Sequence, residues 1–411
     1  MNITRRHFMK SALGSGTLGL TACSPAIRSV FNTGAVRPLP IGARSFARQC
    51  FDGLDRSKLW DVHVHVMGNG KSGSGCYINP AYSESAYKSV LKDIYLGAGG
   101  VKDDESADLA YTDRLLRLHR LANPYGKLVI LAFDYRVNGK GEELISESEI
   151  HTPTEWVLKL AKEHGDLLAG ASIHPYRADA LDLLDAAADQ GAVVVKWLPN
   201  AMGIDPASKR CDAFYQKMAD RGLWLITHGG EERAVDSRET QDYGNVLRLR
   251  RGLDLGCRMI IAHSAGMGSN VDLDQPQSDQ KEMKSFDLFR RLLSEKQYEN
   301  NLMADISAMT QFNRSGRSLR ETIKDSSFHH RLLNGSDFPL PGLRFLVSTQ
   351  VLQKRGLLSP EDREHCNVIF EHNQLLFDFV VKRRLRVQED GREYRLSPII
   401  FETSRIFDHL V

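Results

Sequence analysis

Two histidines with metal-binding spacing lie in an apolar stretch that begins near residue 59. Residues 61–65 have the sequence DVHVH, and an extended strand places alternate side chains on the same face. His63 and His65 would then lie roughly 6–7 Å apart along the strand, where two imidazoles can share one metal ion. A pair of hydrogen-bonded structural histidines gives the same pattern, so this motif alone leaves both interpretations open.

Similar polar residues close four later apolar runs. They are Lys196, His228, His263 and Asp337. In a barrel of parallel strands all carboxyl ends meet at one rim, and barrel enzymes build their active sites there. Five runs with a ligand-type side chain at matching depth therefore predict one polar site at that rim.

Eight short apolar runs alternate with amphipathic segments and would position these residues. The runs are Leu59–Val66, Lys127–Asp134, Leu168–His174, Ala192–Leu198, Leu223–His228, Arg258–His263, Leu302–Ser307 and Arg331–Asp337. Eight strands separated by helices pair in parallel and can close into a (β/α)₈ TIM barrel. An open doubly wound sheet is the alternative, but no GxGxxG or GxxxxGK[ST] element follows any run. We therefore predict an α/β fold built on a TIM barrel.

The predicted barrel domain spans residues 59–383 and is followed by a C-terminal extension over residues 384–411. A helical region from Pro360 to about Lys382 ends the domain. The first connection, residues 67–126, is long and begins with a Gly/Ser-rich stretch at residues 68–75. A loop of that length over the carboxyl ends of the strands predicts a lid.

The N-terminus is predicted to be an export signal over residues 1–22. Residues 4–10, TRRHFMK, look like a twin-arginine motif, and residues 20–23, LTAC, look like a lipobox. We expect export to the periplasm or membrane surface, a lipid anchor on Cys23, and a tether over residues 24–58. Cleavage after Ala22 without lipidation is one alternative, and a chance basic pair followed by an ordinary thiol is another.

The composition indicates a globular protein and gives no sign of a nucleic-acid partner. The 411 residues are 42% hydrophobic, and 54 Lys+Arg against 52 Asp+Glu give a net charge of +2. Such a balance gives no electrostatic basis for binding nucleic acid. The six cysteines include no CxxC pair, which argues against both a disulfide framework and a thiolate zinc site. The sequence leaves homo-oligomer formation open.

As a set, the motifs resemble the metal-dependent amidohydrolase superfamily. The resemblance is carried by HVH at residues 63–65, HGG at 228–230, AHSAG at 262–266 and GSDFP at 335–339. The closer match is the amidohydrolase-related branch, which includes aminocarboxymuconate-semialdehyde decarboxylase-like enzymes and lactone hydrolases. It covers roughly residues 59–380.

The resemblance also implies roles for the candidate residues. The implied metal ligands are His63, His65, His228 and Asp337. Three imidazoles and a carboxylate suit one zinc ion, although manganese, iron or cobalt use the same donors. Asp337 would take the proton of a water whose pKa the metal lowers toward 7, and His263 would polarise the substrate carbonyl.

Lys196 allows three interpretations. In binuclear members of the superfamily a lysine at this strand is carboxylated and bridges two metal ions. The sequence KWLP at residues 196–199 also resembles the Lys-x-x-Pro strand of the mononuclear branch, where an unmodified lysine faces the substrate. A purely structural lysine is the third interpretation. We expect one metal ion, or two if Lys196 is carboxylated.

Other polar residues at the rim have weaker signals. Glu231 and Glu232 could orient a ligand or be solvated, and Asp305 and Ser307 share a face of the seventh strand. Asp134, with Tyr135 and Arg136, and His174 end the second and third runs and suit either substrate contact or hydrogen bonding at the rim. Arginines available to bind a carboxylate are Arg136, Arg177, Arg233, Arg314 and Arg344.

Three functions follow as hypotheses. The first is a metal-dependent hydrolase that cleaves an amide, ester or lactone bond. The second is a non-oxidative, metal-dependent decarboxylase of the same superfamily. The third is a barrel lipoprotein without catalytic turnover, against which the intact ligand positions argue. An export address favours hydrolysis over decarboxylation in central catabolism.

Overall fold

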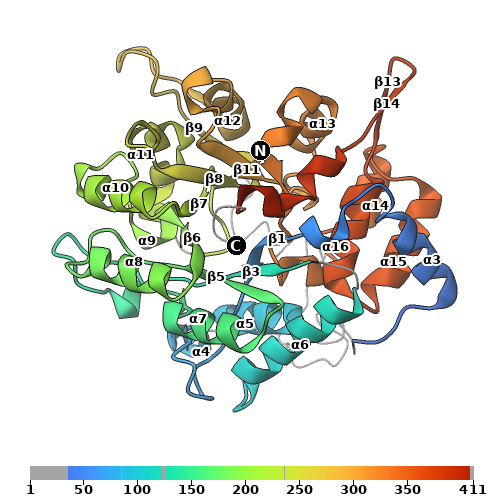
Figure 1. Ribbon diagram of the computed structural model, residues 1–411, viewed down its shortest axis with the longest axis horizontal. Helices are drawn as coiled ribbons and strands as arrows, with labels where there is room; N and C mark the ends of the chain where they lie inside the picture. The colour runs from blue at the N-terminus through green and yellow to red at the C-terminus, as the bar shows by residue number, and fades with distance from the viewer. Residues whose placement is uncertain (1–35, 85, 123–125, 236, 408–411) are drawn as a thin grey trace.

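Eight parallel strands form the central sheet, and helices follow them along the chain (Figure 1). The computed structural model describes residues 36–84, 86–122, 126–235 and 237–407, so the predicted signal and Cys23 lie outside the described residues. The strands are β1 (Asp61–His65), β3 (Leu128–Leu131), β5 (Leu167–Ala171), β6 (Ala192–Trp197), β7 (Trp224–His228), β8 (Arg258–Ala262), β11 (Leu302–Asp305) and β12 (Leu332–Leu333). Each strand overlaps its predicted run.

The sheet closes on itself between its first and last strands. Beyond β12, Phe338 forms a parallel bridge with Val64 of β1. The His65 amide donates to the Phe338 carbonyl at 2.9 Å, and the Asp337 amide donates to the His63 carbonyl at 2.8 Å. The TIM-barrel prediction is therefore confirmed, and closure places β1 and the segment after β12 side by side.

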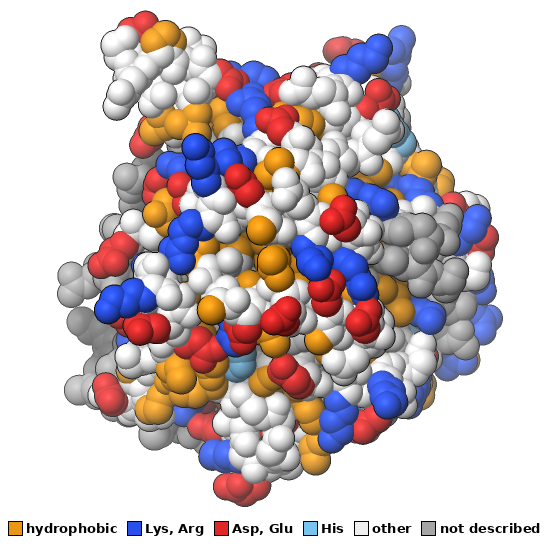
Figure 2. Space-filling model, turned by 60° about the vertical axis from the view of Figure 1, so that its left-hand side comes forward, with side chains coloured by type: hydrophobic (Ala, Val, Ile, Leu, Met, Phe, Trp, Pro, Cys, Tyr) orange, Lys and Arg blue, Asp and Glu red, His pale blue; other side chains and the backbone are white. Residues whose placement is uncertain are grey.

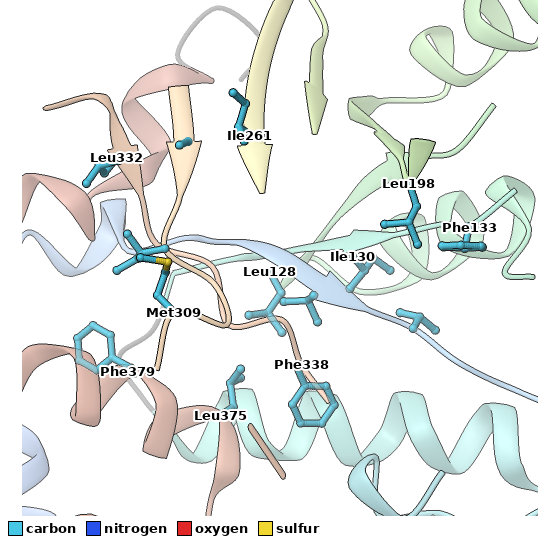
Figure 3. Packing of buried hydrophobic residues seen from close by; sticks show 14 of the residues in the cluster. Leu128, Ile130, Phe133, Leu198, Ile261, Met309, Leu332, Phe338, Leu375 and Phe379 are labelled. Atoms are coloured by element: carbon cyan, nitrogen blue, oxygen red, sulfur yellow. The ribbon is translucent and has the colours of Figure 1, made fainter. Parts of the chain in front are cut away.

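Helices surround the barrel (Figure 1). They are α7 (Thr154–Glu163), α8 (Ala180–Asp189), α9 (Pro199–Met202), α10 (Asp212–Asp220), α11 (Arg250–Asp254), α12 (Ser285–Leu293), α13 (Arg317–Lys324), α14 (Thr349–Lys354), α15 (Pro360–Phe370) and α16 (Gln374–Arg384). Figure 3 shows Leu375 and Phe379 of α16 among the apolar side chains that pack with β3 and Phe338. In the described part of the chain, no helix has the length and apolarity needed to cross a membrane.

The C-terminal extension covers the end of the barrel opposite the predicted site. Trp224 at the start of β7 donates from its indole nitrogen to the Ile406 carbonyl at 3.2 Å. The rings of Trp60 and Phe407 stack with their centroids 5.4 Å apart. Both contacts involve the amino-terminal ends of strands, so the extension seals the lower end of the core with apolar surface.

The long first connection forms a folded insertion. It contains β2 (Tyr77–Ile78), α4 (Ala81–Glu84), α5 (Ala86–Ala98) and α6 (Ala107–Leu121), and β2 pairs with β4 (Ile150–His151). The Tyr95 hydroxyl on α5 donates to the Ala234 carbonyl at 3.0 Å, in the loop after β7. The Tyr111 hydroxyl donates to the His65 carbonyl at 2.8 Å. The insertion thus contacts the rim of the barrel, as the lid hypothesis requires.

Residues 41–58, predicted to belong to a tether, instead pack on the barrel domain. Helix α3 (Ile41–Gln49) buries Ala43, Phe46 and Ala47. The Phe46 ring stacks on His365 of α15 at a centroid distance of 4.3 Å. The prolines at positions 38 and 40 suggested a continuous linker, but the apolar residues after them form an amphipathic helix whose partner is remote in sequence.

Charged side chains of both signs are interspersed on the face that carries α8, α10 and α11 (Figure 2). Several form ion pairs, such as Lys217 with Asp185 at 2.6 Å and Arg248 with Asp205 at 2.9 Å. On the face seen in Figure 2, the described side chains therefore form no extended basic surface of the kind that binds nucleic acid.

A buried ion pair on α16 supports the last strand. The Lys382 ammonium lies 2.6 Å from the Asp378 carboxylate and donates to the Gly335 carbonyl at 2.5 Å. Burial raises the pKa of Asp378 to about 6, against the opposing charge of Lys382. Because Gly335 follows β12 and precedes Asp337, Lys382 holds the backbone that positions a predicted ligand.

Replacing Lys382 with methionine should destabilise the fold by about 3–5 kcal/mol at neutral pH, because it leaves a buried carboxylate without its cation. The Asp378 pKa, already above its usual value of 3.8, should rise further. When an acid has a raised pKa in the folded state, the free energy of unfolding falls as pH rises. The loss of stability in Lys382→Met should therefore be larger at pH 8 than at pH 5.

Urea unfolding of wild type and Lys382→Met at both pH values measures this deficit. Lys354→Met, on an exposed position of α14, is the matched control and should change stability by less than about 0.5 kcal/mol. A deficit that shrinks as pH rises would contradict the assignment.

Candidate metal centre

Closure of the barrel brings the predicted site residues to one rim. On β6 and β7, alternate residues face the interior, with Val194 and Ile226 in the core and Lys196 and His228 above them. The ring centroid of His63 lies 5.1 Å from the ring centroid of His65 and 5.1 Å from that of His263. The ring centroids of His228 and His263 are 5.3 Å apart. The structure thus brings together all six residues predicted for the site.

The most compact ligand set consists of His63, His263 and Asp337. One ligand atom from each lies within 4.8 Å of the others, and all three residues are buried. His65 flanks this set, with its Nε2 atom 3.2 Å from Asp337 Oδ1, and its side chain is 24% exposed. His65 therefore lies between the compact set and solvent.

His63 is oriented by a carboxylate on β11, the strand beyond β12 in the closed barrel. Its Nδ1 atom lies 2.8 Å from Asp305 Oδ2, and both side chains are fully buried. Burial, assisted by the charge of Lys196, lowers the pKa of His63 well below its usual value. The imidazole is therefore neutral and donates its single proton to Asp305, which leaves the Nε2 lone pair facing Lys196 Nζ, 3.0 Å away, with Asp337 Oδ1 at 3.6 Å.

Asp305 organises two further groups. Its Oδ1 atom accepts from the His263 amide at 2.9 Å, from the Ser307 amide at 3.0 Å and from the Ser307 hydroxyl. One buried carboxylate thus connects β1, the turn after β8 and the end of β11. The sequence placed Asp305 on the right face, but its hydrogen bonds to His63 and His263 could not be inferred from spacing.

His263 is oriented in the same way. Its Nδ1 atom donates to the Ser307 hydroxyl oxygen at 2.8 Å. Burial, with the nearby charge of Arg314, lowers the pKa of His263 well below its usual value. A neutral ring that donates from Nδ1 has a lone pair at Nε2, so His263 suits metal binding better than the predicted polarisation of a carbonyl, which needs a donor.

His228 is held by the loop that follows it. Its Nε2 atom donates to the Glu231 carbonyl at 3.3 Å, and its Nδ1 atom lies 3.5 Å from Glu232 Oε2. Burial lowers the pKa of His228 to about 4. A neutral ring that donates from Nε2 has no proton at Nδ1, so Glu232 lies beside His228 without a hydrogen bond to it, whereas Glu231 forms an exposed ion pair with Arg233. The ligand role of His228 stays a prediction.

Lys196 reaches into the compact set. Its Nζ atom lies 3.0 Å from His63 Nε2, and burial lowers its pKa to about 8. An ammonium group and a metal ion would compete for the same histidine lone pair. The position fits either a lysine that acts within the site or one that becomes a ligand by carboxylation, and it gives no support to a purely structural role.

Backbone strain is concentrated at the same rim. Positive φ angles occur at His263 (56°), Ser264 (49°), Ala265 (46°), Ala308 (54°) and Asp337 (60°). Such conformations cost of order 1–3 kcal/mol each and persist where surrounding structure holds them. The backbone at Gly335 also passes so close to His63 that only glycine fits, because a Cβ atom at position 335 would lie 2.7 Å from His63 Cβ.

Other rim candidates have structural partners. Asp134 accepts from the amides of Tyr135 and His174, both at 2.8 Å. The His174 ring contacts the Met202 carbonyl at 3.0 Å and is fully buried. These contacts hold loops at the rim, and the alternative role of the residues in substrate contact stays a prediction.

The donors fit a divalent metal ion. Two neutral imidazoles have their Nδ1 protons engaged by Asp305 and Ser307. Asp337 is ionised: burial raises its pKa, but the hydrogen bond with His65 and the charge of Lys196 outweigh that effect and lower the pKa to about 2. Zinc sites use imidazole nitrogens and carboxylate oxygens as ligands, and the second nitrogen of each ligating histidine is held by a hydrogen bond, as it is here.

A family model described as amidohydrolase matches residues 60–370. The chain belongs to this amidohydrolase family. The match covers the whole barrel from β1 to α15, and the resemblance drawn from the motifs is confirmed at this level. No curated protein matches the sequence.

Several solved structures resemble this amidohydrolase at low identity. An uncharacterised TIM-barrel protein from Bordetella bronchiseptica is 13% identical, with 78% of this chain and 99% of that chain covered and a TM-score of 0.46. A probable 2-pyrone-4,6-dicarboxylic acid hydrolase from Acinetobacter baumannii is 15% identical, with 78% and 95% covered and a TM-score of 0.42. The IDCase of Metarhizium anisopliae is 12% identical, with 87% and 99% covered and a TM-score of 0.45.

Replacing Asp305 with asparagine should weaken zinc binding by about 10- to 100-fold, as loss of a carboxylate that orients a metal-binding histidine does. Competition with a chromophoric chelator measures the affinity. Asp189→Asn, at an exposed position on α8, should leave it unchanged. Equal zinc affinities in wild type and Asp305→Asn would show that Asp305 does not orient the ligands.

Proposed function

We propose that this amidohydrolase cleaves an amide, ester or lactone bond in a small molecule, with water as the nucleophile and one divalent metal ion, most simply zinc, as Lewis acid. The observation that carries the proposal is the buried set of His63, His263 and Asp337 at the carboxyl ends of the strands. A bound ion supplies Lewis acidity and lowers the pKa of a water molecule from 15.7 to about 7.

The protein's own residues would manage the protons. Asp337 is ionised at neutral pH because its pKa is lowered to about 2, so it can accept a proton from water. Its Oδ1 atom is 3.2 Å from His65 Nε2, and His65 is partly exposed. A proton taken by Asp337 can therefore pass to the leaving group or reach solvent through His65.

The rim side chains are also shielded from bulk water. His63, Lys196 and Asp305 are almost completely buried, and the insertion touches the rim through Tyr95 and Tyr111. In such a site fixed dipoles act more strongly than in bulk water. These buried groups support hydrolysis because the Asp337 carboxylate can accept a proton beside neutral histidines, all within one shielded site.

Metal content tests the proposal first. Purified protein from metal-replete expression should contain about one equivalent of zinc, or two if Lys196 is carboxylated. His63→Ala should lose the ion because it removes a central donor, and His330→Ala, at an exposed position, should retain it. A wild-type protein without metal would refute the proposal.

Products then separate hydrolysis from decarboxylation. A panel of esters, lactones, amides and carboxylated aromatic acids is assayed by acid production for the esters and lactones, by amine release for the amides, and by carbon dioxide release. Acid production that stops on chelation and returns with zinc supports hydrolysis. Carbon dioxide release without acid production would replace it with the decarboxylase hypothesis.

We also propose that the chain is exported and tethered at the membrane surface through Cys23. The support is the order of a twin-arginine-like motif, a weakly apolar stretch and a lipobox-like sequence within residues 4–23. A protein exported after folding can acquire its metal ion inside the cell, which suits a buried metal centre.

Cell fractionation tests export. The wild-type chain should appear in the membrane fraction, and joint Arg5→Lys and Arg6→Lys substitution should retain it in the cytoplasm. Cys23→Ala should move exported protein from the membrane to the soluble periplasm, and Arg37→Lys should change nothing. Export of the doubly substituted chain at the wild-type level would contradict a twin-arginine signal.

A further inference from the structure

The outward face of helix α3 carries an exposed apolar side chain together with arginines. Ile41 is 85% exposed, more than any other large apolar side chain in the described part of the chain. Arg44 and Arg48 follow it by three and seven residues, a spacing that places the three side chains on one face of an α-helix. Arg37 is exposed just before the helix. These four residues form what we call the α3 stripe.

The α3 stripe lies on the side of the helix that faces away from the barrel domain. The opposite side is buried through Phe46, whose ring stacks on His365 of α15. Figure 1 shows α3 at the right-hand edge of the domain, outside α15 and α16. The exposed acids Glu361 and Glu364 belong to the helix that covers the buried side of α3. The stripe is therefore presented to solvent on a helix that is already fixed to the domain.

The arginines of the α3 stripe have no ion pair. In the part of the chain that the structure describes, no carboxylate pairs with any of the three, although Arg44 donates to the Leu39 carbonyl at 3.0 Å. An exposed arginine elsewhere, Arg317, lies 2.9 Å from Asp287. Three unpaired positive charges beside an exposed apolar side chain favour a partner that combines anionic groups with an apolar interior.

The chain enters α3 from the segment that follows the predicted lipid anchor. Cys23 precedes Arg37 by 14 residues, and a chain of that length spans at most about 50 Å. Pro38 and Pro40 are exposed beside Ile41 and add apolar surface at the start of the helix. A lipid on Cys23 would therefore keep the α3 stripe within reach of the membrane that holds the lipid.

We propose that the α3 stripe binds the surface of a membrane that contains anionic lipids. Ile41 enters the boundary between headgroups and acyl chains, and the three arginines pair with lipid phosphates while their aliphatic stems cover apolar surface. The inference rests on the proposed export and anchoring of the chain and is independent of the proposed hydrolysis. Each basic side chain near an anionic surface strengthens binding by about fivefold. The stripe thus gives the anchored domain a fixed orientation on the membrane.

Sedimentation with vesicles tests the α3 stripe without the lipid anchor. The chain from position 23 onward with Cys23→Ser lacks both the signal and the lipid, and its binding does not depend on export. It should bind vesicles of equal parts phosphatidylglycerol and phosphatidylcholine, release them at high salt concentration, and bind pure phosphatidylcholine weakly. Joint Arg37→Gln, Arg44→Gln and Arg48→Gln substitution should weaken the binding by about 100-fold.

A matched control removes three positive charges from other faces of the domain. Lys140→Gln, Lys209→Gln and Lys296→Gln, all at exposed positions, change the net charge equally and should bind like the starting chain. Both triple variants should melt at its temperature, because the changed side chains are exposed. Equal weakening in the two triple variants would overturn the proposal, as would a starting chain that does not bind phosphatidylglycerol vesicles.

Fluorescence then tests whether position 41 enters the membrane. Ile41→Trp places an indole on the α3 stripe, whereas the four native tryptophans are at most 6% exposed. Its emission should shift to shorter wavelength with phosphatidylglycerol vesicles, because the indole leaves water, and Leu273→Trp in the loop at residues 272–281 should show no shift. The reverse pattern, or a lipid-free dimer that Ile41→Ser abolishes, would overturn the proposal. Cell fractionation and zinc content report separately on export and on the proposed hydrolase.

Discussion

The buried carboxylate of Asp305 is the constraint on which the site depends. It receives the Nδ1 proton of His63 at 2.8 Å and the backbone amide of His263 at 2.9 Å. Those residues come from β1 and from the turn after β8, two strands that are not adjacent in the sheet, so one side chain sets the orientation of two candidate ligands. A carboxylate without solvent is tolerated only where its oxygens are satisfied, and four donors from His63, His263 and Ser307 meet that need.

These buried charges keep their positions only if the surrounding backbone is rigid. Two sets of contacts in the barrel provide that rigidity. Below the site, Trp60, Trp224 and Phe407 close the core with apolar surface. Behind β12, Lys382 fixes the Gly335 carbonyl. These supports allow several residues to adopt positive φ angles at the rim, since rigid surroundings can hold conformations that a free chain would avoid.

Much of the fold could be predicted from local sequence. Each of the eight strands overlaps a predicted run because a strand buried on both faces needs an unbroken apolar stretch. The predicted tether did not extend to residue 58, because helix α3 is held by His365 and other residues of the C-terminal helices. Local patterns in the sequence indicate helices and strands, but they do not indicate which remote segment a helix will contact.

At the site, the sequence by itself determined which chemical groups would be available and at which end of the barrel. That followed from strand periodicity and from the parallel arrangement of the strands. Only the tertiary structure decided that His263 belongs to the compact set with His63 and Asp337, and that Glu232 approaches His228. Tautomers and ion pairs depend on distances of a few ångströms between different strands, and those distances exist only once the barrel has closed.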